Sequence, residues 1–208
     1  MIVWSGSASQ SKRYNPLLDQ WASISDFNAP VVGPDPMSVW TGTEMIVLQG
    51  NNPASGGRYN PVANSWVRTS DAGAPEFSGY GVAVWTGIEM IVWNAEEPKA
   101  GARYDPASNM WRSMSLAAPS QYCTKAVWTG ARMAMIFGWD VVSVWFYDPI
   151  DDSWAPLSNV GAPQFHDDGC GFTLVWSGSE LLLYGGEGRD GLVHRAAPSP
   201  AMYLYQKQ

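Results

Sequence analysis

The sequence predicts an all-β fold, a β-propeller of about five four-stranded antiparallel blades in which the first and last blades are incomplete. A stretch of the form Val-Trp-Thr/Ser-Gly recurs along the chain, beginning at Val39, Val84, Val127 and Val175, and the chain opens with the related MIVWSG. Between these copies a Tyr recurs seven residues before a Trp, at Tyr14, Tyr59, Tyr104 and Tyr147. Repetition every 43 to 45 residues is typical of propeller blades.

The composition favours the same fold and excludes several classes of partner. The 208 residues include 21 Gly, 15 Pro and 12 Trp, with only 15% charged residues, which favours short strands joined by tight turns. The net charge is −7 without a basic cluster, so we expect no nucleic-acid partner. No apolar run approaches the length of a membrane span. The opening MIVWSGSASQ lacks the features of a signal peptide and starts in mid-repeat, as expected of a piece of something longer or of a gene product that begins there.

One repeat shows how each blade is built. Its four strands are expected at Gly79–Trp85, Glu89–Trp93, Ala102–Tyr104 and Met110–Ser115. Thr86-Gly87 makes a tight turn between the first two, and Asp105-Pro106 ends the third, because Pro cannot donate to a ladder. The second strand is apolar at successive positions, which predicts burial of both its faces.

A lone four-stranded sheet cannot bury two faces, so each repeat needs a like neighbour on either side, as in a propeller. A β-helix or a β-sandwich fits the period and the repeated Tyr and Trp less well. The blades are expected at about residues 1–25, 36–70, 79–115, 122–157 and 170–208 of a single domain. The first lacks its inner strand and the last its outer one. We therefore expect an open arc, a five-bladed ring, or a piece of a larger ring that another chain completes.

The succession VWTGxEMIVW and GRYNPxxxSW resembles the kelch repeat of bacterial propeller proteins over nearly the whole chain. The double glycine that follows the second strand in that family appears here only at Gly185-Gly186. The resemblance implies a bacterial secreted protein, with an extracellular, surface or periplasmic location. Some kelch-like propellers are copper oxidases or sugar epimerases, but with two His in all, the Tyr-Cys pair and two His ligands of such oxidases have no counterpart here.

The links between second and third strands, and between successive blades, differ in every copy, and repeat proteins place such variation on their binding face. These links are Ser7–Lys12, Asn51–Gly56, Asn94–Ala100, Trp139–Val142, Gly185–Pro200, Asp26–Pro36, Asp71–Ser78, Ala117–Gln121 and Asn159–Gly169.

The candidate ligand-binding residues lie in these links. They are Phe77, Gln121, Trp139, Asp140, Phe165, His166, Asp167, Asp168, Arg189 and His194. His166 beside two Asp residues suits a metal ligand or an acid–base group, and equally a solvated acidic loop. Phe27, Phe77 and Phe165 recur at similar places and either stack on a sugar or peptide or plug the link against the next blade. The sequence contains no familiar enzyme motif, and we assign no catalytic residue, metal or cofactor.

Residues repeated in every blade are expected to serve packing. Tyr and Trp fill the space between sheets. The repeated charges, interpreted as ion pairs or hydrogen-bond anchors, are Arg13, Arg58, Arg103, Glu44, Glu89 and Glu180, and Arg132 and Phe146 break both series in the fourth blade. Cys123 and Cys170 either form a bridge or are two buried thiols.

The leading hypothesis is a non-catalytic binding module that recognises a protein or glycan through the variable links. A structural arc that oligomerises or is completed by another chain is the second. The third is a carbohydrate-active or metal-dependent enzyme that uses His166, Asp167, Asp168 and His194.

Overall fold

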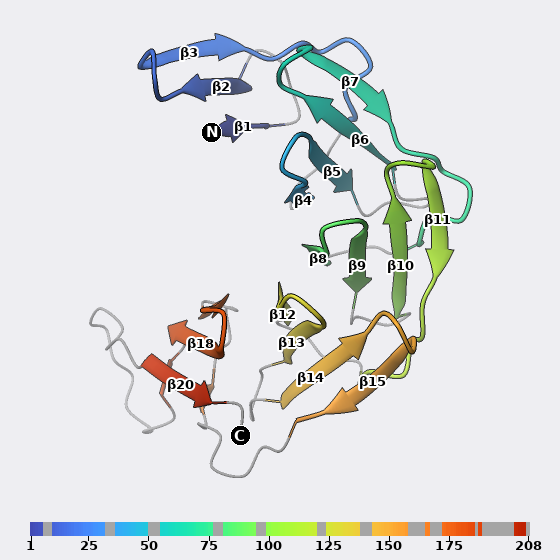
Figure 1. The fold of residues 1–208 in the computed structure, drawn as a ribbon, viewed down its shortest axis with the longest axis vertical. Helices are drawn as coiled ribbons and strands as arrows, with labels where there is room; N and C mark the ends of the chain where they lie inside the picture. The colour runs from blue at the N-terminus through green and yellow to red at the C-terminus, as the bar shows by residue number, and fades with distance from the viewer. Residues whose placement is uncertain are drawn as a thin grey trace. The chain divides into compact units, whose positions relative to one another are not determined.

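The described residues of the computed structural model are all strands, turns and irregular segments, without a helix (Figure 1). They cover residues 1–5, 10–31, 36–49, 55–76, 81–94, 99–119, 124–137, 143–157, 165–166, 172–185, 187–188 and 202–206. The predicted all-β fold is confirmed.

The strands form five successive antiparallel sheets, here called blades 1 to 5. Blade 1 consists of β1 (Ile2–Val3), β2 (Lys12–Asn15) and β3 (Gln20–Ser23). Blade 2 consists of β4 (Met37–Trp40), β5 (Met45–Gln49), β6 (Ser55–Asn60) and β7 (Ser65–Arg68), and blade 3 of β8 (Val82–Trp85), β9 (Met90–Asn94), β10 (Ala100–Asp105) and β11 (Met110–Ser113). Blade 4 consists of β12 (Thr124–Trp128), β13 (Met133–Phe137), β14 (Ser143–Asp148) and β15 (Ser153–Pro156), and blade 5 of β17 (Phe172–Trp176), β18 (Glu180–Gly185) and β20 (Met202–Gln206). A separate ladder joins β16 (Phe165–His166) to β19 (Glu187–Gly188).

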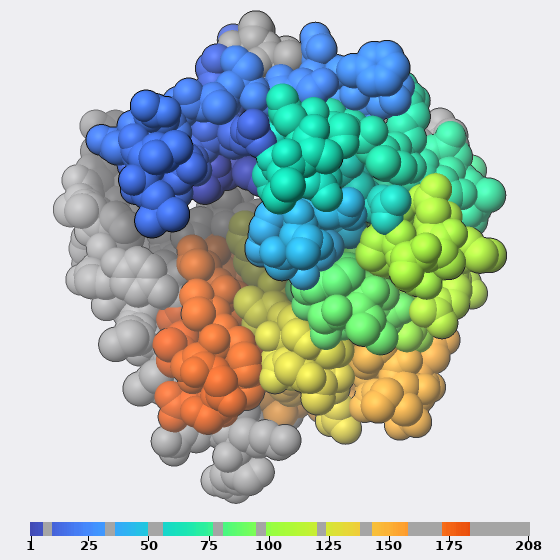
Figure 2. Space-filling model, turned by 45° about the horizontal axis from the view of Figure 1, so that its top comes forward, coloured from blue at the N-terminus to red at the C-terminus, as the bar shows by residue number. Residues whose placement is uncertain are grey.

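These blades belong to two compact units. Unit 1 comprises Met1–Asn94 and Ala100–Ser113 and holds blades 1 to 3, whereas unit 2 comprises Ala95–Lys99 and Met114–Gln208 and holds blades 4 and 5. Within unit 1 the surface of blade 1 is continuous with that of blade 2 (Figure 2, blue beside cyan and blue-green).

Strand register identifies which strands the incomplete blades contain. Ile2 of β1 lies opposite Arg13, as Ile46 of β5 lies opposite Arg58, so β1 is a second strand. At the other end Leu181 lies opposite Tyr205, as Met90 lies opposite Tyr104 in blade 3. The described part of blade 1 thus has strands two to four and that of blade 5 has strands one to three, as the sequence predicts.

The second strands are the apolar centre of the blades. Every residue of β5, β9 and β13 is buried, which confirms that both faces of these strands are covered. In unit 1, Ile46 and Leu48 of blade 2 share a cluster with Met90 and Val92 of blade 3. Each such side chain contributes about 1.5–3 kcal/mol when fully buried, and part of this burial depends on the neighbouring blade.

The turn between first and second strands is the same in blades 2 to 5. In blade 3 the Thr86 hydroxyl donates to the Glu89 carbonyl and accepts from the Glu89 N–H, both at 3.1 Å. The glycine after the Thr or Ser has φ between 93° and 107°, a conformation that favours glycine; these residues are Gly42, Gly87, Gly130 and Gly178.

A set of polar contacts, here called the junction clasp, fastens blade 1 to blade 2. The Trp66 Nε1–H donates to the Ser25 carbonyl at 2.8 Å, and the Ser25 N–H donates to Asn64 Oδ1 at 3.1 Å. The Tyr59 hydroxyl donates to the same Asn64 oxygen at 2.7 Å. The carbonyl and the N–H of Ser25 are therefore each held by one side chain of blade 2, and Tyr59 binds the Asn64 side chain that accepts the N–H.

The junction clasp recurs at two further junctions. In unit 1, Trp111 and Asn109 hold Ser70 at 2.7 and 3.0 Å, and Tyr104 binds Asn109. In unit 2 the same contacts join Trp154, Asp152 and Tyr147 to Ser115. The Asn or Asp has φ between 48° and 56°, a left-handed conformation that these two residue types tolerate best among those with a side chain. The repeated Tyr and Trp thus have a polar role as well as the predicted packing role.

The Ser that is bound in each clasp begins a short segment, here called the hook. In its first copy the hook packs against the next blade. Its first two copies are SDFNAP (Ser25–Pro30) and SDAGAP (Ser70–Pro75). In both, the Ala N–H donates to the Asp carbonyl three residues earlier, at 3.0 and 3.2 Å. Pro30 is buried against blade 2, where a Cβ on Gly57 would lie only 2.9 Å from Pro30 Cδ. Glycine at position 57 therefore makes room for the hook.

The repeated charges Arg13, Arg58, Arg103, Glu44 and Glu89 form ion pairs or hydrogen bonds, as predicted. The Arg13 guanidinium donates to the Pro61 carbonyl of the next blade, and Arg58 donates to that of Pro106. Buried Glu89 accepts from Arg103 at 2.6 and 2.8 Å and from Arg112 at 3.1 Å. In blade 4 Arg132, which breaks the Glu series, pairs with Asp148 at 3.0 Å, so this blade keeps an ion pair but uses a different position of the third strand.

Replacing Trp66 by Phe is expected to lower the free energy of unfolding by about 2 kcal/mol, because the Ser25 carbonyl loses its donor and the ring shrinks. The matched control is Trp21→Phe, which alters the same repeat position in blade 1, where the indole is exposed, and is expected to change stability by less than about 0.5 kcal/mol. Chemical denaturation measures both. Equal losses in the two variants would contradict the assignment of the clasp.

Glu89→Gln is expected to cost about 2 kcal/mol, because it removes a buried carboxylate that two guanidinium groups share. Glu44→Gln is the control, since Glu44 lies 3.9 Å from Arg58 and is partly exposed; we expect less than about 1 kcal/mol there. The denaturant midpoints of the two variants measure both losses of stability. A larger loss for Glu44→Gln than for Glu89→Gln would contradict the prediction.

Candidate functional site

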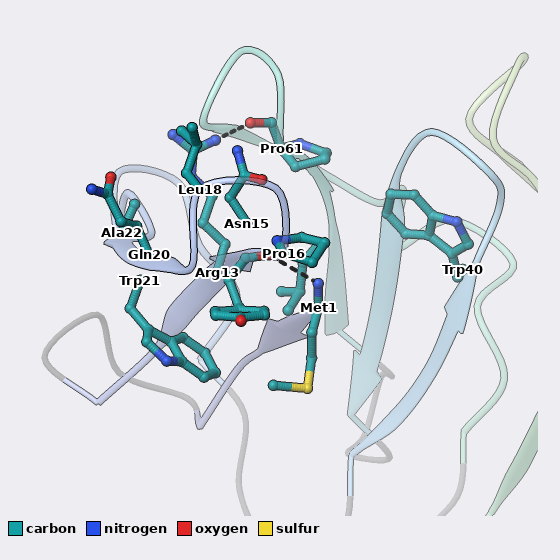
Figure 3. A pocket seen from close by; sticks show the side chains of 12 residues that line it. Met1, Arg13, Asn15, Pro16, Leu18, Gln20, Trp21, Ala22, Trp40 and Pro61 are labelled. Carbon is teal, nitrogen blue, oxygen red and sulfur yellow. Dashed lines mark hydrogen bonds between the residues drawn. The ribbon is translucent and has the colours of Figure 1, made fainter.

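A cavity of about 560 Å³ lies on blade 1 (Figure 3). Its wall is formed by β1, β2, β3 and the turn between the last two, with Trp40 and Pro61 contributed by blade 2. A second cavity of about 320 Å³ also contacts Met1 and Ile2 and extends to Met45. Because β1 pairs only with β2 among the described strands, both cavities border its unpaired edge.

Several polar groups that line the larger cavity already form hydrogen bonds within the protein. The Tyr14 N–H donates to the Met1 carbonyl at 2.8 Å, and the Met1 nitrogen donates to the Tyr14 carbonyl at 3.1 Å. Arg13 donates to Pro61. Figure 3 shows Trp21 and Trp40 on opposite sides of the site, and both indoles are about half exposed, at 52% and 49%. Exposed indoles beside a few hydrogen-bonding groups suit the binding of a peptide or sugar.

The tyrosines of the clasps are structural donors. Burial, opposed by the nearby Arg58 charge, raises the pKa of Tyr104 to about 12. Burial also raises the pKa of Tyr59, against the effect of Arg13. In blade 1 the hydrogen bond to Asp19 is the main cause of the raised pKa of Tyr14. These hydroxyls remain protonated at neutral pH, as donors to Asn or Asp must be.

Two carboxylates in turns have lowered pKa values for equally local reasons. The Ser108 hydroxyl donates to Asp105 and is the main cause of its lowered pKa, and the Ile150 N–H is the main cause for Asp148. Both are bound by their own turns, so neither is an acid or base available for catalysis.

Of the residues predicted from the variable links, the structure describes the backbone of Phe165 and His166. They form β16, in which Phe165 lies opposite Gly188 and His166 opposite Glu187. This ladder ties the link that precedes blade 5 to the link that follows β18, two segments of unit 2 that are 20 residues apart. It joins the two links at these two residue pairs.

The other predicted site residues lie outside the described residues. They are Phe77, Gln121, Trp139, Asp140, Asp167, Asp168, Arg189 and His194, and the same holds for Cys123 and Cys170. Phe27, which is described, is 77% exposed, so it does not plug its link against the next blade.

Two features are absent from the described ranges, a cluster of metal ligands and a helix that could span a membrane. There, no three His, Cys, Asp or Glu side chains gather closely enough to hold a metal ion. The same part of the chain has no helix with the length and apolarity of a membrane span.

The cavity on blade 1 was missed by sequence reasoning, which placed the site in the links. A signal existed, because the first blade lacks its inner strand and Trp21 belongs to a repeat series in which Trp66 and Trp111 are buried in unit 1.

No family model matches this sequence, and no curated protein is similar to it. Among solved structures the chain is similar to the crystal structure of TolB from Acinetobacter baumannii, with a TM-score of 0.54 and 11% sequence identity. The likeness covers 94% of this chain and 48% of the TolB chain, so this chain spans about half the length of that protein. TolB is a propeller, and the likeness supports the propeller fold and only the fold.

Proposed function

We propose that the chain is a non-catalytic, kelch-type β-propeller module that binds a protein or glycan through its variable links. The observation that carries this proposal is the β16–β19 ladder, which joins two of the longest links of unit 2 at Phe165–His166 and Glu187–Gly188. A binding surface needs such a connection, because links that are ordered only on binding lower the affinity by their ordering cost.

The residues that recur in the blades support the same function, because their polar groups are already used in contacts within and between blades. Glu89 is shared by two Arg residues, while Tyr104 and Trp111 are committed to the clasp with blade 2. Residues repeated in every blade therefore serve packing, and differences between blades are concentrated in the links. Variation of this kind on a rigid repeated scaffold is how repeat proteins acquire a specific ligand.

The test uses the full chain on an immobilised glycan array and against a displayed random-peptide library. A saturable ligand is expected from one of them, and replacing residues 159–169 by a Gly-Ser link of equal length should weaken it at least about tenfold, equivalent to about 1.4 kcal/mol. Phe27→Ala, an exposed change in unit 1, is the matched control and should leave binding unchanged.

Two results would contradict the proposal. One is the absence of a saturable ligand in both screens. The other is a ligand whose affinity is unaffected by the replacement of residues 159–169 in a chain that remains folded by circular dichroism.

A further inference from the structure

We propose that the end of unit 1 formed by its short turns binds the surface of a zwitterionic phospholipid bilayer. The contact is made by three exposed apolar side chains, here called the tips, at Leu17, Val62 and Ile88, which enter the boundary between headgroups and acyl chains. This surface goes beyond the proposed function, because the variable links leave the blades at the opposite ends of the strands.

The turns between strands one and two and between strands three and four lie at the same end of each blade. In blade 2 one row of register partners runs across all four strands next to both turns, through Trp40, Met45, Tyr59 and Trp66. The row recurs in blade 3, and the Arg anchors of blades 1 and 2 each bind the turn of the next blade. The turns of blades 1 to 3 therefore share one end of unit 1.

The residue after the turn proline is apolar in all four copies of the turn between strands three and four. These residues are Leu17, Val62, Ala107 and Ile150, although turns favour Asn, Asp, Ser and Gly. Leu17 and Val62 are 93% exposed, and Ile88, in the other turn of blade 3, is 75% exposed. Single exposed apolar side chains are ordinary on protein surfaces, but these gather at one end of unit 1.

The tips stay exposed whatever covers the outward face of blade 1. Val62 belongs to blade 2, whose clasp holds Ser25, and it keeps its exposure although the hook is bound. Leu17 is the equivalent residue of blade 1. A hook bound to blade 1, from this chain or from another, would therefore leave Leu17 exposed to a membrane.

The backbone of the tips suits lipid, which offers no hydrogen-bond partner to an N–H group. Each tip N–H donates to the side chain two residues before it. The acceptors are Asn15 Oδ1, Asn60 Oδ1 and the Thr86 hydroxyl, at 3.0, 2.9 and 3.3 Å. The tips can therefore leave water without the cost of an unpaired amide.

The same turns present no unpaired charge to a membrane. Residues 15–20, 41–44, 60–65, 86–89 and 105–110 contain no Lys, Arg or His, and their carboxylates are Asp19, Glu44, Glu89 and Asp105. A hydroxyl or a guanidinium lies 2.6 to 3.9 Å from each of these carboxylates. A protein partner could pair a charge across the interface, whereas the acyl chains of a bilayer could not, so these features favour lipid.

An indole lies one level behind the tips. Trp40 is the last residue of β4, directly before its turn, and is about half exposed. It lines the larger cavity together with Pro16, Leu18 and Pro61, the neighbours of two tips (Figure 3). Trp side chains prefer the headgroup level of a membrane. The order of tips and indole therefore matches the order of acyl boundary and headgroups in a bilayer.

The test is flotation of the full chain with vesicles of phosphatidylcholine. Binding should rise with lipid concentration and persist in about 0.5 M salt, because the contact uses no charge. Leu17→Ser, Val62→Ser and Ile88→Ser should each weaken partition at least about threefold, and the triple variant at least about tenfold, since each change removes an apolar side chain from the contact.

Matched variants make the test specific. Val31→Ser is the control for Val62→Ser, because Val31 is 82% exposed and lies in the link that follows blade 1, at the other end of unit 1. It should leave partition unchanged. Ala107→Leu adds a larger tip at an exposed position of blade 3 and should strengthen partition at least about threefold. All these positions are exposed, so circular dichroism should be unchanged in each variant.

Three outcomes would overturn the proposal. One is the absence of flotation at millimolar lipid, and another is an equal loss of partition in Val31→Ser and Val62→Ser. The third is self-association without lipid that the triple variant abolishes in sedimentation, which would make the occupant a second copy. Because the tips lie outside the variable links, failure of this surface is separate from failure of the proposed function.

Discussion

The structure depends on one side-chain oxygen in each of the three described clasps. Oδ1 of Asn64, Asn109 or Asp152 accepts a tyrosine hydroxyl of its own blade and the backbone N–H of Ser25, Ser70 or Ser115, respectively. Its residue adopts a left-handed conformation to place that oxygen, which is why Asn or Asp stands there. A buried tyrosine hydroxyl left without an acceptor would cost about 1–3 kcal/mol, so the aromatic core and the junction stabilise each other.

The dependence between blades explains the character of the first blade. A blade of this kind covers both faces of its second strand only when it has neighbours, and blade 1 has blade 2 on one side in unit 1. Its other face keeps the Tyr14, Asp19 and Trp21 arrangement that the repeat supplies, although no described residue covers it. The candidate cavity follows from this circumstance, because the described residues leave part of the repeat surface of blade 1 uncovered.

Much of the fold could be predicted because the repeat is expressed in spacing. The strands, the Thr-Gly turns and the incomplete ends follow from the period and from the apolar run of each second strand. The clasp was missed because it joins a side chain of one repeat to the backbone of another, although Ser25, Ser70 and Ser115 each follow a repeat Trp by four residues. Tyr205 was missed as a fifth repeat Tyr because no Asn-Pro or Asp-Pro follows it. The β16–β19 ladder joins unrelated links by two residue pairs, for which no periodic pattern exists.

Amide hydrogen exchange at Ser25, Ser70 and Ser115 tests the central role of the clasp most directly. These three N–H groups lie beyond the ends of their strands, where ladder hydrogen bonds no longer protect them. If the clasp holds the blades together, their exchange should be as slow as that of the buried amides of β5 and β9, because opening requires separation of two blades. Exchange at the rate of exposed turn amides would show that apolar packing alone holds the blades together, and would contradict a central role for the clasp.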